Sequence, residues 1–68
     1  MAMEIPEAIR TAAKRQNVTV TQVAVIAGVT EAAARRWMKG EADITGFRLE
    51  ILRRELPGLA ALLDGKAA

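Results

Sequence analysis

The residues of this sequence that could do chemistry are basic side chains and threonine hydroxyls, and they favour binding over catalysis. Histidine, cysteine, serine and tyrosine are absent from the 68 residues, so the common catalytic bases and nucleophiles are missing. The carboxylates are scattered along the chain, and the histidine and cysteine ligands that zinc prefers do not occur. We therefore expect no catalytic residue, no metal site and no cofactor.

Positive charge is concentrated in the first half of the chain, although the net charge of the whole is only +2. Residues 10–39 contain six basic residues and one acidic residue, which gives +5. Two acidic residues give −2 over residues 1–9, and four basic against five acidic residues give −1 over residues 40–68. This distribution suits a polyanionic partner, and the simpler alternative is an ordinary solvated helix face.

Helical periodicity and capping signals predict the elements that must position these charges. Apolar residues at the spacing of one helix face predict a helix over residues 6–16, with Pro6 in its first turn. Thr19 followed by Gln22 is typical of a capping box, so a second helix is expected to begin there. Gly28 can end that helix, because glycine adopts the left-handed conformation without a Cβ clash.

A third helix is expected between Thr30, whose side chain can cap it, and Gly40, which can end it. Its expected inward positions are Ala33, Ala34, Trp37 and Met38. Further helices are predicted over residues 46–56, capped by Thr45, and over residues 59–64. The sequence thus predicts an all-α fold, a compact single five-helix domain over residues 1–68 with an ordered core at about 5–64 and a short C-terminal tail.

The stretch from Thr19 to Gly40 has the pattern of two helices that cross closely at a tight turn. A small residue, Ala24, permits the close approach, and Gly28-Val29-Thr30 forms the turn. In these residues, together with Arg36-Trp37, the chain resembles the Cro/CI-like family of phage and bacterial helix-turn-helix regulators. The resemblance covers about residues 5–64, and it implies that the helix after the turn lies in the major groove of DNA.

The resemblance also implies a set of DNA-contacting residues. Those expected to face DNA bases are Thr30, Glu31, Ala32 and Arg35, and those expected near phosphates are Arg36 and Lys39. Thr19, at the start of the motif, and Arg10 and Lys14, beside it, are further candidates. Glutamate can accept a hydrogen bond from cytosine and alanine can contact only a thymine methyl, so Arg35 would supply much of the sequence discrimination.

Two pairs of apolar residues lie outside the expected core faces. Val25 and Ile26 fall about 200° and 300° around the helix from Val23. Phe47 and Ile51 lie roughly opposite the leucines of the fourth helix. These four side chains either form a dimer or partner surface or pack against a neighbouring helix. A chain this small gains stability when apolar surface is covered, which favours a homodimer.

Two functional hypotheses follow from these patterns. The first is a cytoplasmic transcriptional regulator of phage or bacterial type, a repressor or an activator, that binds a specific double-stranded DNA sequence as a homodimer. The second is a module of the same fold that binds another protein and no longer recognises DNA. The charge of residues 10–39 favours the first, whereas Glu31, Ala32 and the surplus apolar surface favour the second. The first four residues lack the basic and apolar regions typical of a signal peptide, and no apolar run approaches about 20 residues, so we expect no membrane association.

Overall fold

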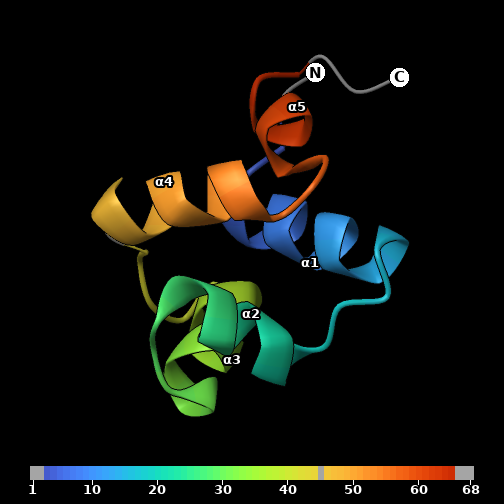
Figure 1. The fold of residues 1–68 in the computed structure, drawn as a ribbon. Coiled ribbons are helices and arrows are strands. Elements are labelled where there is room, and N and C mark those ends of the chain that lie inside the picture. Colours follow the sequence, from blue (N-terminus) through green and yellow to red (C-terminus); the bar gives the residue numbers. More distant parts are fainter. Residues whose placement is uncertain (1–2, 45, 66–68) are drawn as a thin grey trace.

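Five helices occupy the segments that the sequence predicts, in a computed structural model that describes residues 3–44 and 46–65 (Figure 1). They are α1 (Ile5–Arg15), α2 (Val20–Ala27), α3 (Glu31–Lys39), α4 (Gly46–Glu55) and α5 (Leu59–Leu63). Each bound lies within one residue of its predicted position, and the described residues contain no strand. The prediction of an all-α, five-helix fold is confirmed. The predicted cap Thr45 and the tail 66–68 lie outside the described residues.

The helix starts on either side of the central turn are fixed by local hydrogen bonds. At the start of α2 the Thr19 hydroxyl oxygen accepts from the Gln22 backbone N–H at 3.2 Å, and the Gln22 side-chain oxygen accepts from the Thr19 N–H at 2.8 Å. These are the two bonds of the predicted capping box. At the start of α3 the Thr30 hydroxyl oxygen accepts from the Ala33 N–H at 3.1 Å. Local sequence therefore sets where α2 and α3 begin.

A three-residue turn, Gly28 to Thr30, joins α2 to α3. Gly28 has a φ of +73°, in the left-handed region that glycine adopts without steric cost. The Gly28 N–H donates to the Val25 carbonyl at 3.2 Å, and the Val29 N–H donates to the Ala24 carbonyl at 3.0 Å. These bonds satisfy the last carbonyls of α2, so the chain can leave the helix and begin α3 three residues later.

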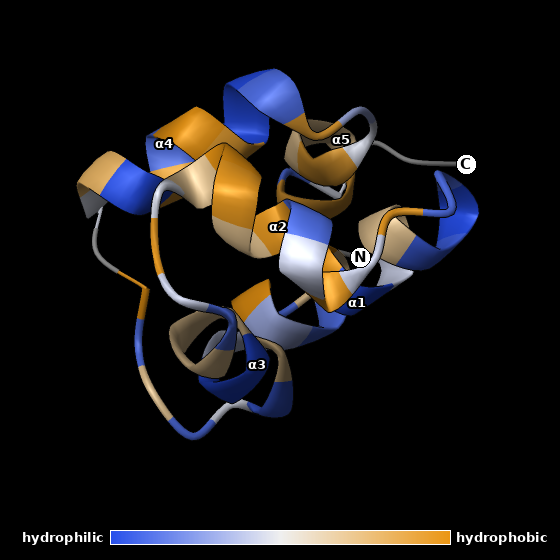
Figure 2. Ribbon diagram, turned by 60° about the horizontal axis from the view of Figure 1, so that its bottom comes forward, coloured by the Kyte–Doolittle hydropathy of each residue, from blue (hydrophilic) through white to orange (hydrophobic). Residues whose placement is uncertain are grey.

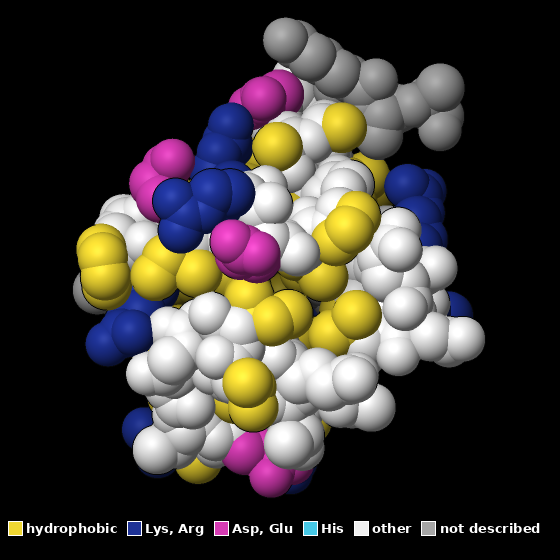
Figure 3. Space-filling view, viewed as in Figure 1, with side chains coloured by type: hydrophobic (Ala, Val, Ile, Leu, Met, Phe, Trp, Pro, Cys, Tyr) yellow, Lys and Arg dark blue, Asp and Glu magenta, His cyan; other side chains and the backbone are white. Residues whose placement is uncertain are grey.

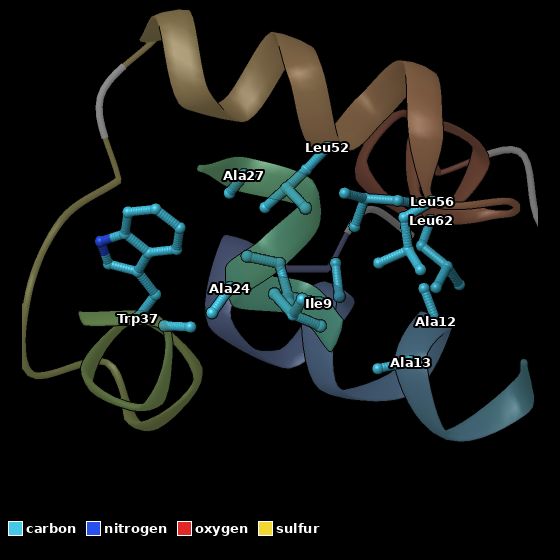
Figure 4. Close-up of a cluster of buried hydrophobic side chains, with 13 residues drawn as sticks. Ile9, Ala12, Ala13, Ala24, Ala27, Trp37, Leu52, Leu56 and Leu62 are labelled. Carbon is cyan, nitrogen blue, oxygen red and sulfur yellow. The ribbon is translucent and has the colours of Figure 1, made fainter. Parts of the chain in front are cut away.

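One apolar core holds the five helices together, and none of its described buried side chains is polar or charged. Helix α1 packs on α3 and α5, and α2 packs on α3 and α4. Figure 4 shows Trp37, from α3, at one end of the cluster and Leu56 and Leu62 at the other. Trp37 is only 7% exposed, so its indole fixes the inner face of α3 against the rest of the molecule.

Arg48 connects α4 to the end of α2. Its Nη1 donates to the carbonyl oxygen of Ala27 at 2.7 Å and to that of Gly28 at 3.3 Å. The same guanidinium lies 5.4 Å from the centre of the Phe47 ring. A cation at a helix C-terminus interacts favourably with the partial negative charge of the free carbonyls. This contact therefore fixes the turn that leads into α3 relative to α4.

Candidate functional site

Helix α3 divides into a buried face and a charged face. Ala34 and Trp37 lie in the core, and Ala33 and Met38 are half-buried beside it. The exposed residues are the ones expected to contact DNA, namely Glu31, Ala32, Arg35, Arg36 and Lys39. In Figure 2 much of α3 is blue or tan, whereas orange covers much of α2. The same helix is thus anchored on one side and presents polar groups on the other.

The charged face of α3 lines an open groove of about 360 Å³. Its lining residues are Glu31, Ala32, Arg35, Arg36, Lys39 and Glu41. The structure therefore brings together five of the residues selected from the sequence, and Thr30 caps the helix at one end of them. Three basic and two acidic side chains give the groove a net charge of +1.

The three basic side chains of the groove differ in their partners. Arg35 donates through Nη2 to Glu31 Oε1 at 2.7 Å, which forms an ion pair between residues one helical turn apart. Arg36 and Lys39 form no ion pair among the described residues. Exposed cations without a partner keep their charge available for an external anion. Arg36 and Lys39 are therefore the groups of this groove best suited to bind phosphate.

Glu41 is a member of the groove that the sequence analysis missed. Gly40 ends α3 with a φ of +77°, and the Glu41 N–H donates back to the Arg36 carbonyl at 2.9 Å. This backward bond is the six-residue contact of a Schellman motif, which folds the residue after the glycine against the helix. The glycine stop was predicted, and a Schellman geometry at Gly40 would have placed Glu41 beside the basic residues.

The two threonines selected as DNA contacts lie at helix starts. Thr19 and Thr30 each use the hydroxyl oxygen as an acceptor for a backbone N–H of the following turn. A hydroxyl that accepts one bond still has its own O–H to donate. Both residues are exposed, so each can donate to an anion without losing its cap.

Arg10 and Lys14, both on α1, differ in what they contact. The Arg10 guanidinium donates through Nη1 to the carbonyl oxygen of Met38, in the last turn of α3. This bond holds Arg10 at the C-terminal end of the charged face, where it satisfies a helix carbonyl. Lys14 is exposed and forms no ion pair among the described residues.

The four apolar residues selected as a dimer or partner surface separate into two groups. Val25 is 76% exposed and Phe47 is 70% exposed. Ile26 and Ile51 are half-buried, and Ile26 packs against the core cluster. Figure 3 shows hydrophobic side chains gathered in a band on the face where α4 lies above α2. Val25 and Phe47 are thus the large apolar side chains available to a partner.

Metal and membrane features are absent from the part of the chain that the structure describes. In residues 3–44 and 46–65 no three acidic side chains are grouped as metal ligands. None of the described helices has the length and hydropathy needed to span a bilayer.

No model of a known protein family, no curated protein and no solved structure matches this chain. The function is therefore inferred from the chemistry and geometry of its own surface.

Proposed function

We propose that this protein is a small transcriptional regulator that binds a specific sequence of double-stranded DNA. Helices α2 and α3 act as a helix-turn-helix, with α3 in the major groove. The observation that carries the proposal is the charged face of α3. There Arg36 and Lys39 have no ion-pair partner within residues 3–44 and 46–65, while Trp37 anchors the opposite face in the core. The proposed position of α3 is compatible with the size of an α-helix, since the major groove is about 12 Å wide and accepts one.

Each part of the face has a distinct role in this proposal. Arg36 and Lys39 neutralise phosphates, and the hydroxyls of Thr19 and Thr30 donate to the same backbone. Arg35 reaches base edges, because it lies one turn into the helix and an arginine can contact guanine with two hydrogen bonds. The small side chain of Ala32 allows α3 to approach the DNA bases closely. Lys14 adds positive charge from α1, whereas Arg10 supports the end of α3 through Met38.

Dimerisation through the exposed apolar residues is part of the proposal. Val25 and Phe47 are the large apolar side chains that the described fold leaves uncovered. A second copy of the chain that covered them would supply a second α3 for a second half-site on DNA. Ile51 lies one turn from Phe47 on α4 and extends the same surface. We place this regulator in the cytoplasm, where its DNA would be accessible.

A second candidate function is supported by one observation. Uncovered apolar side chains such as Val25 and Phe47 also suit a module that binds another protein. In that case the fold is retained, the charged face of α3 is solvated, and the partner covers α2 or α4. The two functions differ in whether DNA binds at all.

The test is a titration of fluorescent duplex DNA at several salt concentrations. If about four phosphates are contacted, log K should fall against log salt with a slope near −3.6. Absence of binding at low salt, with random-sequence and genomic-neighbourhood duplexes, contradicts the proposal. A wild-type protein that binds no DNA but forms a stable complex with a protein partner would establish the second candidate.

A further inference from the structure

We infer that Glu31 is a positioning residue for Arg35, holding its guanidinium for base contact and away from phosphate. This inference deepens the proposed function and rests on it. The carboxylate is part of the same groove as the basic side chains, and the ion pair that it forms among the described residues is with Arg35. A carboxylate repels DNA phosphates, so its presence in this groove needs a reason.

The geometry of the pair supplies that reason. Glu31 Oε1 and Arg35 Nη2 are 2.7 Å apart, at the short end for a charge-assisted hydrogen bond. The glutamate precedes the arginine by four residues, the favourable order along a helix. Both side chains are about half exposed, at 53% for Arg35 and 48% for Glu31. An exposed ion pair adds little to stability, so the bias that it places on the orientation of the Arg35 side chain is of the same modest size.

The pair leaves Arg35 able to read a base. The bond to Glu31 uses the Nη2 end of the guanidinium, and further N–H donors remain for the O6 and N7 acceptors of guanine. A guanidinium already bonded to a carboxylate is a poorer partner for phosphate, because part of its charge is neutralised. Glu31 in turn has one acceptor oxygen occupied, which reduces its own capacity to accept from cytosine.

A matched control lies in the same groove. Glu41 lines it with Glu31 and forms no ion pair within the described residues. Glu31→Ala and Glu41→Ala each remove one negative charge from the groove, and only Glu31→Ala releases Arg35. General electrostatics therefore predicts the same result for both variants, whereas a positioning role predicts different results.

The experiment begins with selection of duplexes from a randomised library by the wild-type protein. Affinities of wild type, Glu31→Ala and Glu41→Ala are then measured on the selected duplex and on a scrambled duplex of equal length, at several salt concentrations. For Glu31→Ala we expect the ratio of the two affinities to fall about twofold, the orienting effect of one exposed ion pair between residues four positions apart. Its salt slope on scrambled DNA should steepen by about 0.9, because Arg35 becomes free to contact phosphate.

For Glu41→Ala we expect tighter binding to both duplexes, an unchanged affinity ratio and an unchanged salt slope. Arg35→Lys, which keeps the charge and loses the planar donors, should lower the ratio more, about 5- to 150-fold, because it removes the bidentate base contact itself. Circular dichroism checks that each variant keeps its helices. Equal ratios and slopes for the two glutamate variants would overturn the inference while leaving the proposed function intact. A wild-type protein that binds no duplex would overturn both.

Discussion

Helices α3 and α4 carry similar numbers of arginines, but they use these side chains in opposite ways. On α4 each of the three arginines has a partner: Arg48 donates to carbonyls of the α2 end, Arg53 pairs with Asp64 at 3.4 Å, and Arg54 pairs with Glu55 at 3.3 Å. On α3 Arg35 pairs with Glu31, and Arg36 and Lys39 form no ion pair with any residue that the structure describes. Two of the three arginines of α4 thus contact other parts of the fold, whereas the basic side chains of α3 are exposed and make no such contact among the described residues.

The aromatic residues of the two helices differ in the opposite direction. The aromatic residue of α3, Trp37, is buried in the core, whereas that of α4, Phe47, is 70% exposed. Helix α3 therefore buries its aromatic ring and presents charged side chains outward, whereas α4 presents its aromatic ring to solvent among charged residues. This contrast is the basis for proposing different partners for the two helices, a polyanion for α3 and an apolar protein surface for the Phe47 end of α4.

Replacing the two aromatic residues tests this contrast with the largest expected effect. Trp37→Ala should destabilise the fold by about 3–5 kcal/mol, because it leaves a cavity beneath α3. Phe47→Ala should cost below about 1 kcal/mol, since it removes an exposed ring and one contact with Arg48. Urea unfolding followed by circular dichroism measures both. Similar losses from the two changes would mean that Phe47 belongs to the core.

Removing two charges from each helix tests where DNA binds. Arg36→Ala with Lys39→Ala should weaken binding at low salt at least about tenfold, and the salt slope should become shallower by about 1.8. Arg53→Ala with Arg54→Ala removes the same net charge from α4 and should leave the slope unchanged. Anisotropy titrations with one duplex measure all three proteins. An equal loss from the α4 double variant would show that only net charge matters.

A smaller effect is expected at the glycine between α2 and α3. Gly28→Ala should destabilise by about 1–2 kcal/mol, because the residue has a positive φ. Its new Cβ would also lie 3.0 Å from Arg48 Nη1, which must then move. Gly46→Ala, at the start of α4, meets nothing within 4 Å and should be neutral or stabilising by up to about 1 kcal/mol. Thermal unfolding distinguishes the two, and a destabilising Gly46→Ala would contradict the local account.

The smallest effect on stability is expected from charging the exposed apolar side chains. Val25→Glu with Phe47→Glu should shift the mass measured by light scattering from dimer to monomer while the helical signal persists. DNA affinity should fall with the mass, because the gain from two linked half-sites is lost. Thr21→Glu, also exposed on α2, is the control and should change neither. If the double variant has the same mass as the wild-type protein, any dimer contact must lie away from Val25 and Phe47.

The helix bounds could be predicted from the sequence where they are set by hydrogen bonds and backbone conformations within a few residues. The caps at Thr19 and Thr30 act over three residues, and Gly28 and Gly40 end their helices through their own backbone conformation. Each such signal can be recognised in a short window of sequence. This is why all five helices were predicted within a residue of their bounds.

The candidate site could be predicted from the sequence only in part, because its other contacts join residues that are far apart in the sequence. The exposed face of α3 followed from helical periodicity, but the contacts of Arg10 with Met38 and of Arg48 with Ala27 join residues more than 20 positions apart. Ile26 shows a limit of periodicity as well. It lies at the edge of the core face of α2, where a neighbouring side chain decides burial, and it packs against the core.

The most direct test of the central claim, that α3 binds DNA through its charged face, is a nuclear magnetic resonance titration. Backbone amide shifts of the ¹⁵N-labelled protein are followed as a duplex selected from the randomised library is added. We predict that the largest changes fall on residues 30–39 and at the start of α2, with little change along the outer face of α4. Changes confined to α4, or none at saturating duplex and low salt, would contradict the account.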